Sequence, residues 1–176
     1  SLFPVPLLLE DGNPADQIKS VALGGSHAIF LMADGTVSGM GKNVAWSLGA
    51  LSEGPHKFLT PIPNLTNVSQ IATSGVESWF VKNDGTLWGM GMGPGSLTQI
   101  SGASDIVQVS GGGNGGNFIK SDGTLWSWYI DSVSQVPGVS DAVQVSAGTY
   151  HYLFIKSDET LWASGSNSLG QLGTGN

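Results

Sequence analysis

The chain contains no cysteine among its 176 residues, and this absence removes several classes of site. Disulfide frameworks, zinc sites with thiolate ligands and cysteine nucleophiles are all excluded. Basic residues are scarce as well, since 6 Lys and Arg stand against 13 Asp and Glu and the formal net charge is −7. Binding to nucleic acid or to anionic membrane surfaces needs clustered Lys and Arg, so neither is an expected partner.

Long apolar runs are also missing. No run approaches the roughly 20 residues that a membrane-spanning helix needs. The stretch at residues 7–9 is short and has no basic residues before it, so it does not read as a signal peptide. Hydrophobic residues still make up 40% of the chain, which is too many for a disordered protein. With 27 glycines and only 11% charged residues, the composition favours short strands joined by tight turns.

One short motif, an apolar run that meets an Asp and leaves through a Thr, occurs four times. The copies are FLMADGTV at residues 30–37, FVKNDGTL at 80–87, FIKSDGTL at 118–125 and FIKSDETL at 154–161. Asp-Gly between two apolar runs predicts a β-hairpin with a type I′ turn, in which both central residues have positive φ. Glu159 replaces the glycine in the last copy, which suggests another turn type there because a non-glycine residue costs about 1 kcal/mol at positive φ.

The four motifs are in register with other repeated positions. Their Asp residues, called anchors below, are Asp34, Asp84, Asp122 and Asp158, at spacings of 50, 38 and 36 residues. An aliphatic residue lies thirteen positions before each anchor and a Phe four positions before it. Each unit therefore predicts strand, glycine turn, strand, hairpin and strand, and most units carry a further apolar segment for a fourth strand. Units of this length and make-up predict the four-stranded antiparallel blades of an all-β propeller.

The repeats place a single β-propeller array over residues 1–176. They cover residues 18–63, 68–101, 106–137 and 142–176, and the last one has no fourth strand of its own. Residues 2–9, in contrast, are extended and proline-containing, with no unit before them. Prolines suit an edge strand because a missing N–H costs little there. We therefore expect residues 2–9 to complete the last blade or the blade of a neighbouring subunit.

The repeats resemble a known family. The resemblance is carried by VQVSAGTYH at residues 143–151, by the hairpin that follows, and by NSLGQLG at residues 167–173. Together these segments are similar to the regulator-of-chromosome-condensation repeat, whose members are seven-bladed propellers. Four repeats leave three arrangements open: part of a longer array, half of a ring completed by a second copy, or a four-bladed ring. We rank the last lowest, because blades built for a wide ring would need strong extra tilt to close at four.

Most residues that carry chemistry have a structural explanation in the repeat. His27 and His151 occupy the same repeat position, which points to one local niche in separate blades. The anchor Asp residues are explained by their turns. The glycine-rich residues 111–117 lack the Lys-Ser/Thr of a phosphate loop, and no Ser/His/Asp spacing suggests a nucleophile. We expect no catalytic residue, no metal and no cofactor.

The candidates for binding are the residues that depart from the repeat. They are Lys42, Asn43, Trp46 and His56 in the long loop of the first repeat, and Trp128 and Tyr129 in the third. An equally good explanation of the aromatic residues is that they cover a blade edge or a subunit contact.

The sequence thus predicts a non-catalytic binding or assembly module, whose partner is another protein, a second copy or a longer chain that completes the ring. Low lysine with much Ser, Thr, Gly and Asn favours an extracellular place on a bacterial or viral surface. Trp46 and the Trp128-Tyr129 pair leave open a carbohydrate-binding adhesin. The family's best-known member is a nucleotide exchange factor for a small GTPase and binds chromatin, so the resemblance also implies a GTPase regulator. The charge of −7 argues against chromatin.

Overall fold

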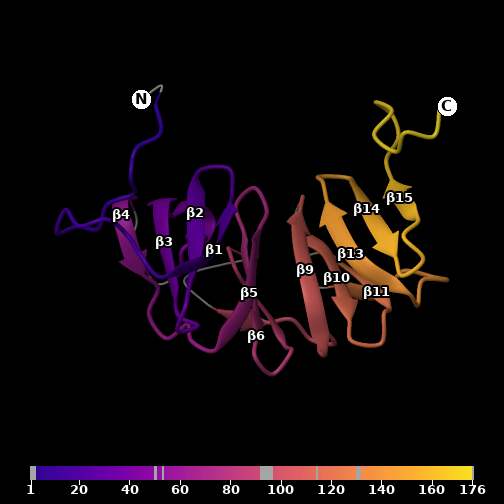
Figure 1. Ribbon diagram of the computed structural model, residues 1–176, viewed down its shortest axis with the longest axis horizontal. Coiled ribbons are helices and arrows are strands. Elements are labelled where there is room, and N and C mark those ends of the chain that lie inside the picture. Colours follow the sequence, from indigo (N-terminus) through magenta and orange to yellow (C-terminus); the bar gives the residue numbers. More distant parts are fainter. Residues whose placement is uncertain are drawn as a thin grey trace.

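Four antiparallel sheets, joined in sequence order, make up the computed structural model, which describes residues 3–49, 51–52, 54–91, 97–113, 115–129 and 132–175 (Figure 1). Each sheet is a blade in which the strands follow one another from the inner to the outer edge. Blade 1 contains β1 (Ile18–Leu23), β2 (His27–Met32), β3 (Val37–Lys42) and β4 (Pro55–Pro61). Blade 2 contains β5 (Val68–Thr73), β6 (Ser78–Lys82), β7 (Leu87–Met90) and β8 (Thr98–Gln99). Blade 3 contains β9 (Ile106–Gly112), β10 (Gly115–Lys120), β11 (Leu125–Tyr129) and β12 (Ser132–Gln135).

Blade 4 has three described strands, β13 (Ala142–Ala147), β14 (His151–Lys156) and β15 (Leu161–Gly165). The described part of the chain also contains one short 3₁₀ segment, η1 (Val44–Trp46). The predicted all-β propeller architecture is confirmed. No helix among the described residues has the length and apolar character needed to cross a membrane.

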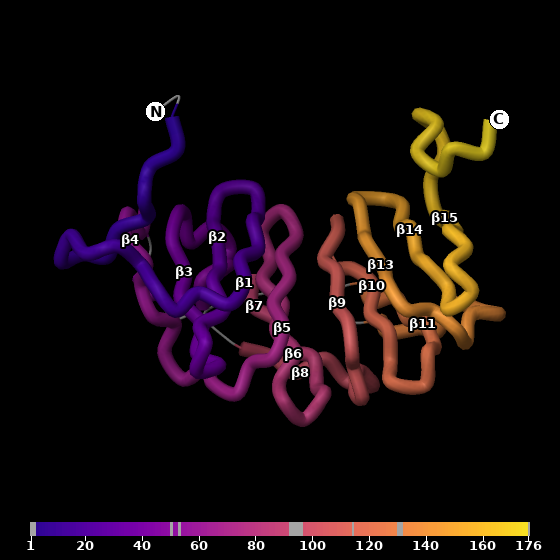
Figure 2. The backbone as a smooth tube through the Cα atoms, viewed as in Figure 1, coloured from indigo at the N-terminus to yellow at the C-terminus, as the bar shows by residue number. Residues whose placement is uncertain are grey.

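The blades follow an open arc, with the first and last blades at its two ends (Figure 2). The first strand of each blade lies beside the first strand of the next, so that β1, β5, β9 and β13 line the concave side. Both termini leave the arc on the same side, one at each end (Figure 1). A single copy of the chain therefore does not close a ring.

Successive blades pack face against face, and the same repeat positions meet each time. Ile29, Leu31 and Val37 of blade 1 pack with Phe80 and Ile71 of blade 2. We call the side of a blade that meets the following blade its forward face, and the opposite side its backward face. Because alternate residues of a strand point to opposite sides, the second strand of each blade supplies both faces. This explains why the residues of β2 and β6 are almost all buried.

The repeated hairpins form as predicted, but their turns are of a different type. The Gly35 N–H donates to the Met32 carbonyl at 3.1 Å, and the Met32 N–H donates to the Thr36 carbonyl at 2.9 Å. Gly35 has a φ of 81°, whereas Asp34 is not among the residues with positive φ. The prediction of a type I′ turn is therefore wrong: the Asp does not have the positive φ that this turn requires, and only the residue after it is left-handed, as in a type I turn followed by a bulge.

The fourth hairpin keeps this turn without glycine. Glu159 has a φ of 67°, and its N–H donates to the Lys156 carbonyl at 3.0 Å, as the glycines do in the other copies. The expectation of another turn type is wrong as well. The strands on both sides of this turn pair in the same register as in blade 1, with Ile155 opposite Leu161 as Leu31 is opposite Val37.

The amino-terminal segment does not complete the last blade within one chain. Leu8 bridges Pro14, and the Ala15 N–H donates to the Leu7 carbonyl at 2.8 Å, so this segment folds back on itself. Leu7 and Leu9 pack with Phe30 and its neighbours on the backward face of blade 1. This face is apolar, and among the described residues it is this segment that packs against it, and not beside β15. Pairing of residues 2–9 with a neighbouring subunit stays a prediction.

Candidate interaction surface

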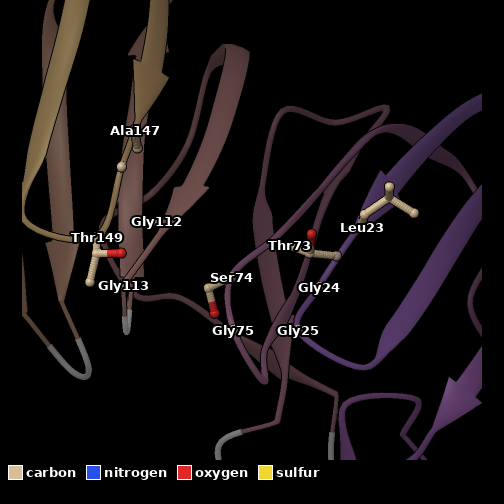
Figure 3. A pocket seen from close by; sticks show the side chains of 11 residues that line it. Leu23, Gly24, Gly25, Thr73, Ser74, Gly75, Gly112, Gly113, Ala147 and Thr149 are labelled. Atoms are coloured by element: carbon tan, nitrogen blue, oxygen red, sulfur yellow. The ribbon is translucent and has the colours of Figure 1, made fainter.

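The turns after the first strand of each blade lie together on one face of the molecule and surround a pocket of about 280 Å³ (Figure 3). We call this face, formed by residues 23–26, 73–77, 112–113 and 147–150, the turn face. Leu23 and Thr73 lie on one side of the pocket and Thr149 on the other. None of the lining side chains is ionisable. The pocket therefore offers backbone groups and small side chains, but no group for general acid–base chemistry.

Glycine in these turns is required by two histidine rings. A Cβ at Gly24 would overlap the imidazole of His27, and a Cβ at Gly148 would overlap that of His151. The N–H of each glycine also donates to the carbonyl of its histidine, at 2.9 Å and 2.7 Å. The two histidines thus occupy equivalent local niches.

His27 belongs to a buried chain of hydrogen bonds that connects blades 1 and 2. The Ser78 hydroxyl donates to the Ser47 carbonyl at 2.7 Å, so its oxygen must accept from His27 Nε2 at 2.9 Å. This arrangement requires the tautomer with a proton on Nε2. Burial lowers the pKa of His27, which favours the neutral ring.

Glu77 occupies the same repeat position in blade 2 and is also buried. Burial raises the pKa of its carboxyl group, and a hydrogen bond donated by the Ser74 hydroxyl at 2.9 Å partly opposes that effect. Among the described residues, no group of three or more His, Cys, Asp or Glu side chains could hold a metal ion.

Four of the residues predicted to bind lie in the long loop of blade 1 or in the strand ends beside it: Lys42 ends β3 and His56 belongs to β4. Asn43 is buried: its amide donates to the Leu51 carbonyl at 2.7 Å, and its oxygen accepts from the Leu48 N–H at 2.8 Å. Asn43 therefore holds the loop together and is not open to a ligand. Lys42 is exposed, Trp46 is half-buried, and His56 Nε2 lies 3.0 Å from the Ser52 carbonyl. Binding by these three residues stays a prediction.

The two aromatic residues of blade 3 differ sharply. Trp128 is only 2% exposed and meets Trp79 edge to face, with ring centroids 5.0 Å apart, between blades 2 and 3. It cannot meet a ligand at the surface, and packing at a blade contact is its role. Tyr129, which follows it along β11, is 59% exposed and remains available.

Sequence reasoning missed the exposed apolar residues of the turn face. Leu23 is 73% exposed and Tyr150 is 76% exposed, and both lie at the turns that surround the pocket. Leu169 belongs to the loop whose Ser166 N–H donates to the Tyr150 carbonyl at 2.8 Å, and its side chain is also exposed. The available signal was a Tyr at a turn position where the first repeat has Ser26.

The comparisons with known proteins agree with this architecture. The model of the regulator of chromosome condensation (RCC1) repeat matches residues 18–45 and 142–171, in blades 1 and 4. No curated protein matches the chain in sequence.

Among solved structures, Prp20p from Saccharomyces cerevisiae superposes with a TM-score of 0.78 at 18% identity, covering 90% of this chain and 48% of Prp20p. Human WBSCR16 superposes with a TM-score of 0.77 at 19% identity, covering 90% of this chain and 50% of that protein. The computationally designed Ika4 protein has a TM-score of 0.61 at 16% identity, with 93% and 98% covered. The chain thus spans about half the length of the two natural propellers. By structure, and by the repeat sequence of its first and last blades, this chain has an RCC1-like β-propeller fold.

Proposed function

We propose that the chain is a non-catalytic protein-binding module that uses the turn face. The observation that carries this proposal is the set of exposed apolar side chains, Leu23, Val76 and Tyr150, beside a pocket lined by glycines. Exposed apolar groups gathered at one place on a protein mark an interaction site more often than a chance arrangement. Tyr supplies contact area at little entropic cost and is enriched in protein interfaces.

The composition of the pocket supports a protein partner over a small charged substrate. Its lining has no ionisable side chain, so an ionised ligand would find no charged partner there. Loops from all four blades share this face of the molecule, which gives a broad surface of the kind that proteins recognise.

The test compares two surface substitutions in the purified chain. Tyr150→Ser alters the turn face, and Phe58→Ser, a matched exposed aromatic on β4, serves as the control. The amount of each protein that wild type captures should fall at least tenfold with Tyr150→Ser and stay unchanged with Phe58→Ser. Quantitative mass spectrometry of the captured proteins measures both. Equal capture by both variants would remove the turn face as the binding surface.

Regulation of a small GTPase is a second candidate. The structure of Prp20p was described together with its binding properties to Gsp1p and histones. Release of a fluorescent nucleotide from Gsp1p, with and without this chain, tests the candidate directly. An unchanged release rate would eliminate it.

Carbohydrate binding rests on fewer residues than the sequence suggested, because Trp128 is buried and only Trp46 and Tyr129 remain. A glycan array on wild type and Trp46→Ala decides this alternative. An extracellular place on a bacterial or viral surface stays a prediction, and protease accessibility on intact cells or particles would test it.

A further inference from the structure

The forward face of blade 4 is open, although the same face is buried in every other blade. In blade 1 it is formed by Ile29, Leu31 and Val37, which are at most 1% exposed. The equivalent residues of blade 4 are Leu153, Ile155 and Leu161. The first two are partly exposed and Leu161 is 65% exposed. Three times in this chain such a face is covered by the backward face of a following blade.

The loop after β15 is built like the loop after β3. Asn43 Oδ1 accepts from the Leu48 N–H at 2.8 Å, and Asn167 Oδ1 accepts from the Leu172 N–H at 3.0 Å. Leu48 is fully buried in the cluster that holds Met90 of blade 2, whereas Leu172 is partly exposed. Leu172 is thus positioned to enter a following blade as Leu48 does.

Blade 1 carries the hollow that Leu172 would need. A pocket of about 270 Å³ lies on its backward face beside Ala28 and Met40. Counted from the anchors, these two residues correspond to Ser78 and Met90 of blade 2. Ser78 bonds to the loop at Ser47, and Met90 packs with Leu48. The place that the loop fills between blades 1 and 2 is therefore open on blade 1.

The inner strands point to the same pairing. Gln70 Nε2 of blade 2 donates to the Val107 carbonyl of blade 3 at 2.7 Å. Gln108 Oε1 of blade 3 accepts from the Val145 N–H of blade 4 at 2.9 Å. Gln144 has the same repeat position in blade 4 and is exposed. Gln144 is therefore placed to bond to the first strand of a following blade, as Gln70 and Gln108 do.

The amino-terminal segment has the register of a fourth strand. Gln17, Asn67 and Asp105 directly precede β1, β5 and β9, and all three are left-handed. When Gln17 is aligned with Asn67, Ala15 corresponds to Leu65. Leu9 then corresponds to Ile62, if the segment between Leu9 and Gln17 is three residues longer than the one between Ile62 and Asn67. Residues 3–8 then take the place of β4, in the blade that comes before blade 1.

We infer that a second copy of this chain covers the forward face of blade 4 with its own blade 1, so that two copies form one closed ring. The two open faces lie at opposite ends of the arc, and both termini leave on its open side (Figure 1). A twofold rotation therefore brings each open face to the other copy. One copy spans 48–50% of the two natural propellers, so two supply about one such length.

In this ring, residues 3–8 of each copy leave blade 1 and pair with β15 of the other. The forward face of blade 4 of the other copy then packs against Phe30 on the backward face of blade 1, where Leu7 and Leu9 pack in the single chain. The register follows from the three complete blades, where Gly39 faces Thr60, Gly89 faces Thr98 and Ser127 faces Ser134. The same spacing places Ala163 opposite Leu7 of the other copy.

Light scattering on the whole chain tests the stoichiometry. We expect wild type to have twice the chain mass of 18.1 kDa, and Leu161→Asp and Leu172→Asp to have the mass of one chain. Leu169→Asp, in the same loop as Leu172 but directed to solvent, should keep the double mass. A wild type of single mass at about 100 µM, an open-ended series of larger species, or variants that keep the double mass would each overturn the inference.

Cross-linking tests the strand exchange. In a chain with no native cysteine, the double variant Leu7→Cys and Ala163→Cys should give a covalent dimer with a short bismaleimide, and each single variant should not. Cross-linking within one chain, or none, would overturn the exchange. The inference does not rest on the proposed function, because Tyr150→Ser should reduce partner binding and leave the mass of the assembly unchanged.

Discussion

Glu159 has a left-handed backbone conformation that suits glycine better than a residue with a side chain. Its φ of 67° is one that the equivalent glycines adopt without strain. Glu159→Gly should raise the free energy of unfolding by about 1 kcal/mol, measured by urea denaturation. The reverse change, Gly123→Glu, is the control and should destabilise, because its Cβ would lie 2.6 Å from the Ser140 carbonyl oxygen. A destabilised Glu159→Gly would show that the carboxylate has a role that the backbone does not reveal.

Glu77 gives the protein a predictable response to pH. Burial raises the pKa of its carboxyl group above the ordinary value near 4.5, so the group favours folding while protonated. Its contribution is fully present below pH 4.5 and is lost as the pH rises through the folded-state pKa. Glu77→Gln has no carboxyl group to ionise and does not show this loss. The melting temperature of the variant minus that of wild type should therefore grow as the pH rises from 4 to 8.

His27 acts in the opposite direction, because its lowered pKa weakens folding only as the pH falls below about 6.5. Both proteins contain His27, so it cancels in the comparison of Glu77→Gln with wild type. A difference between the two proteins that stays constant from pH 4 to pH 8 would contradict the role of Glu77.

At the scale of the element, each hairpin is a closed set of interactions. Asp122 Oδ1 accepts from the Thr124 hydroxyl at 2.6 Å and from its N–H at 2.9 Å. These two bonds, the hydroxyl first, lower the pKa of Asp122. The same hydroxyl accepts from Trp126 Nε1 at 2.8 Å, and Lys120 Nζ lies 4.3 Å from the Trp126 ring centroid. The repeated Asp, Thr, Trp and Lys residues are therefore explained by the hairpin itself.

Thr124→Val should destabilise the protein by about 1 kcal/mol, because a partly buried indole N–H loses its acceptor. Thr160→Val is the matched change in blade 4, where Trp162 is half exposed and water can replace the hydroxyl. Its cost should be smaller, and urea denaturation of the two variants measures the difference. Equal costs would show that water does not reach Trp162.

The sequence predicts the hairpins well because their determinants lie within a few residues of one another. It does not predict their turn type, since Asp-Gly is compatible with two turns and the strand register decides between them. The sequence makes Trp128 a binding candidate because it breaks the local pattern, although cover of a blade edge explains it equally well. Its repeat position holds Met40 and Met90 in the first two blades, which is the signature of a blade contact. The exposure of Leu23 and Tyr150 cannot be predicted from the sequence, because it depends on where the turns of distant blades meet.

At the scale of the whole molecule, the chain is a linear array in which each blade is stabilised by its neighbours. Blades 2 and 3 are covered on both faces, and Phe80 and Phe118 at their centres are fully buried. Blade 4 is covered on its backward face alone. In such arrays stability is close to a sum over neighbouring contacts, so the end with one contact opens most readily.

Hydrogen exchange should report this difference strand by strand. In Leu172→Asp, which we expect to be a single chain, amides of β14 should exchange at least tenfold faster than those of β6 and β10. In wild type at concentrations where two copies assemble, protection of β14 should approach that of β10, because a blade of the second copy then covers its forward face. Mass spectrometry of peptides from β6, β10 and β14 measures the exchange rates of the three strands in one experiment. Uniform protection in Leu172→Asp would mean that blade 4 does not depend on a following blade for its stability.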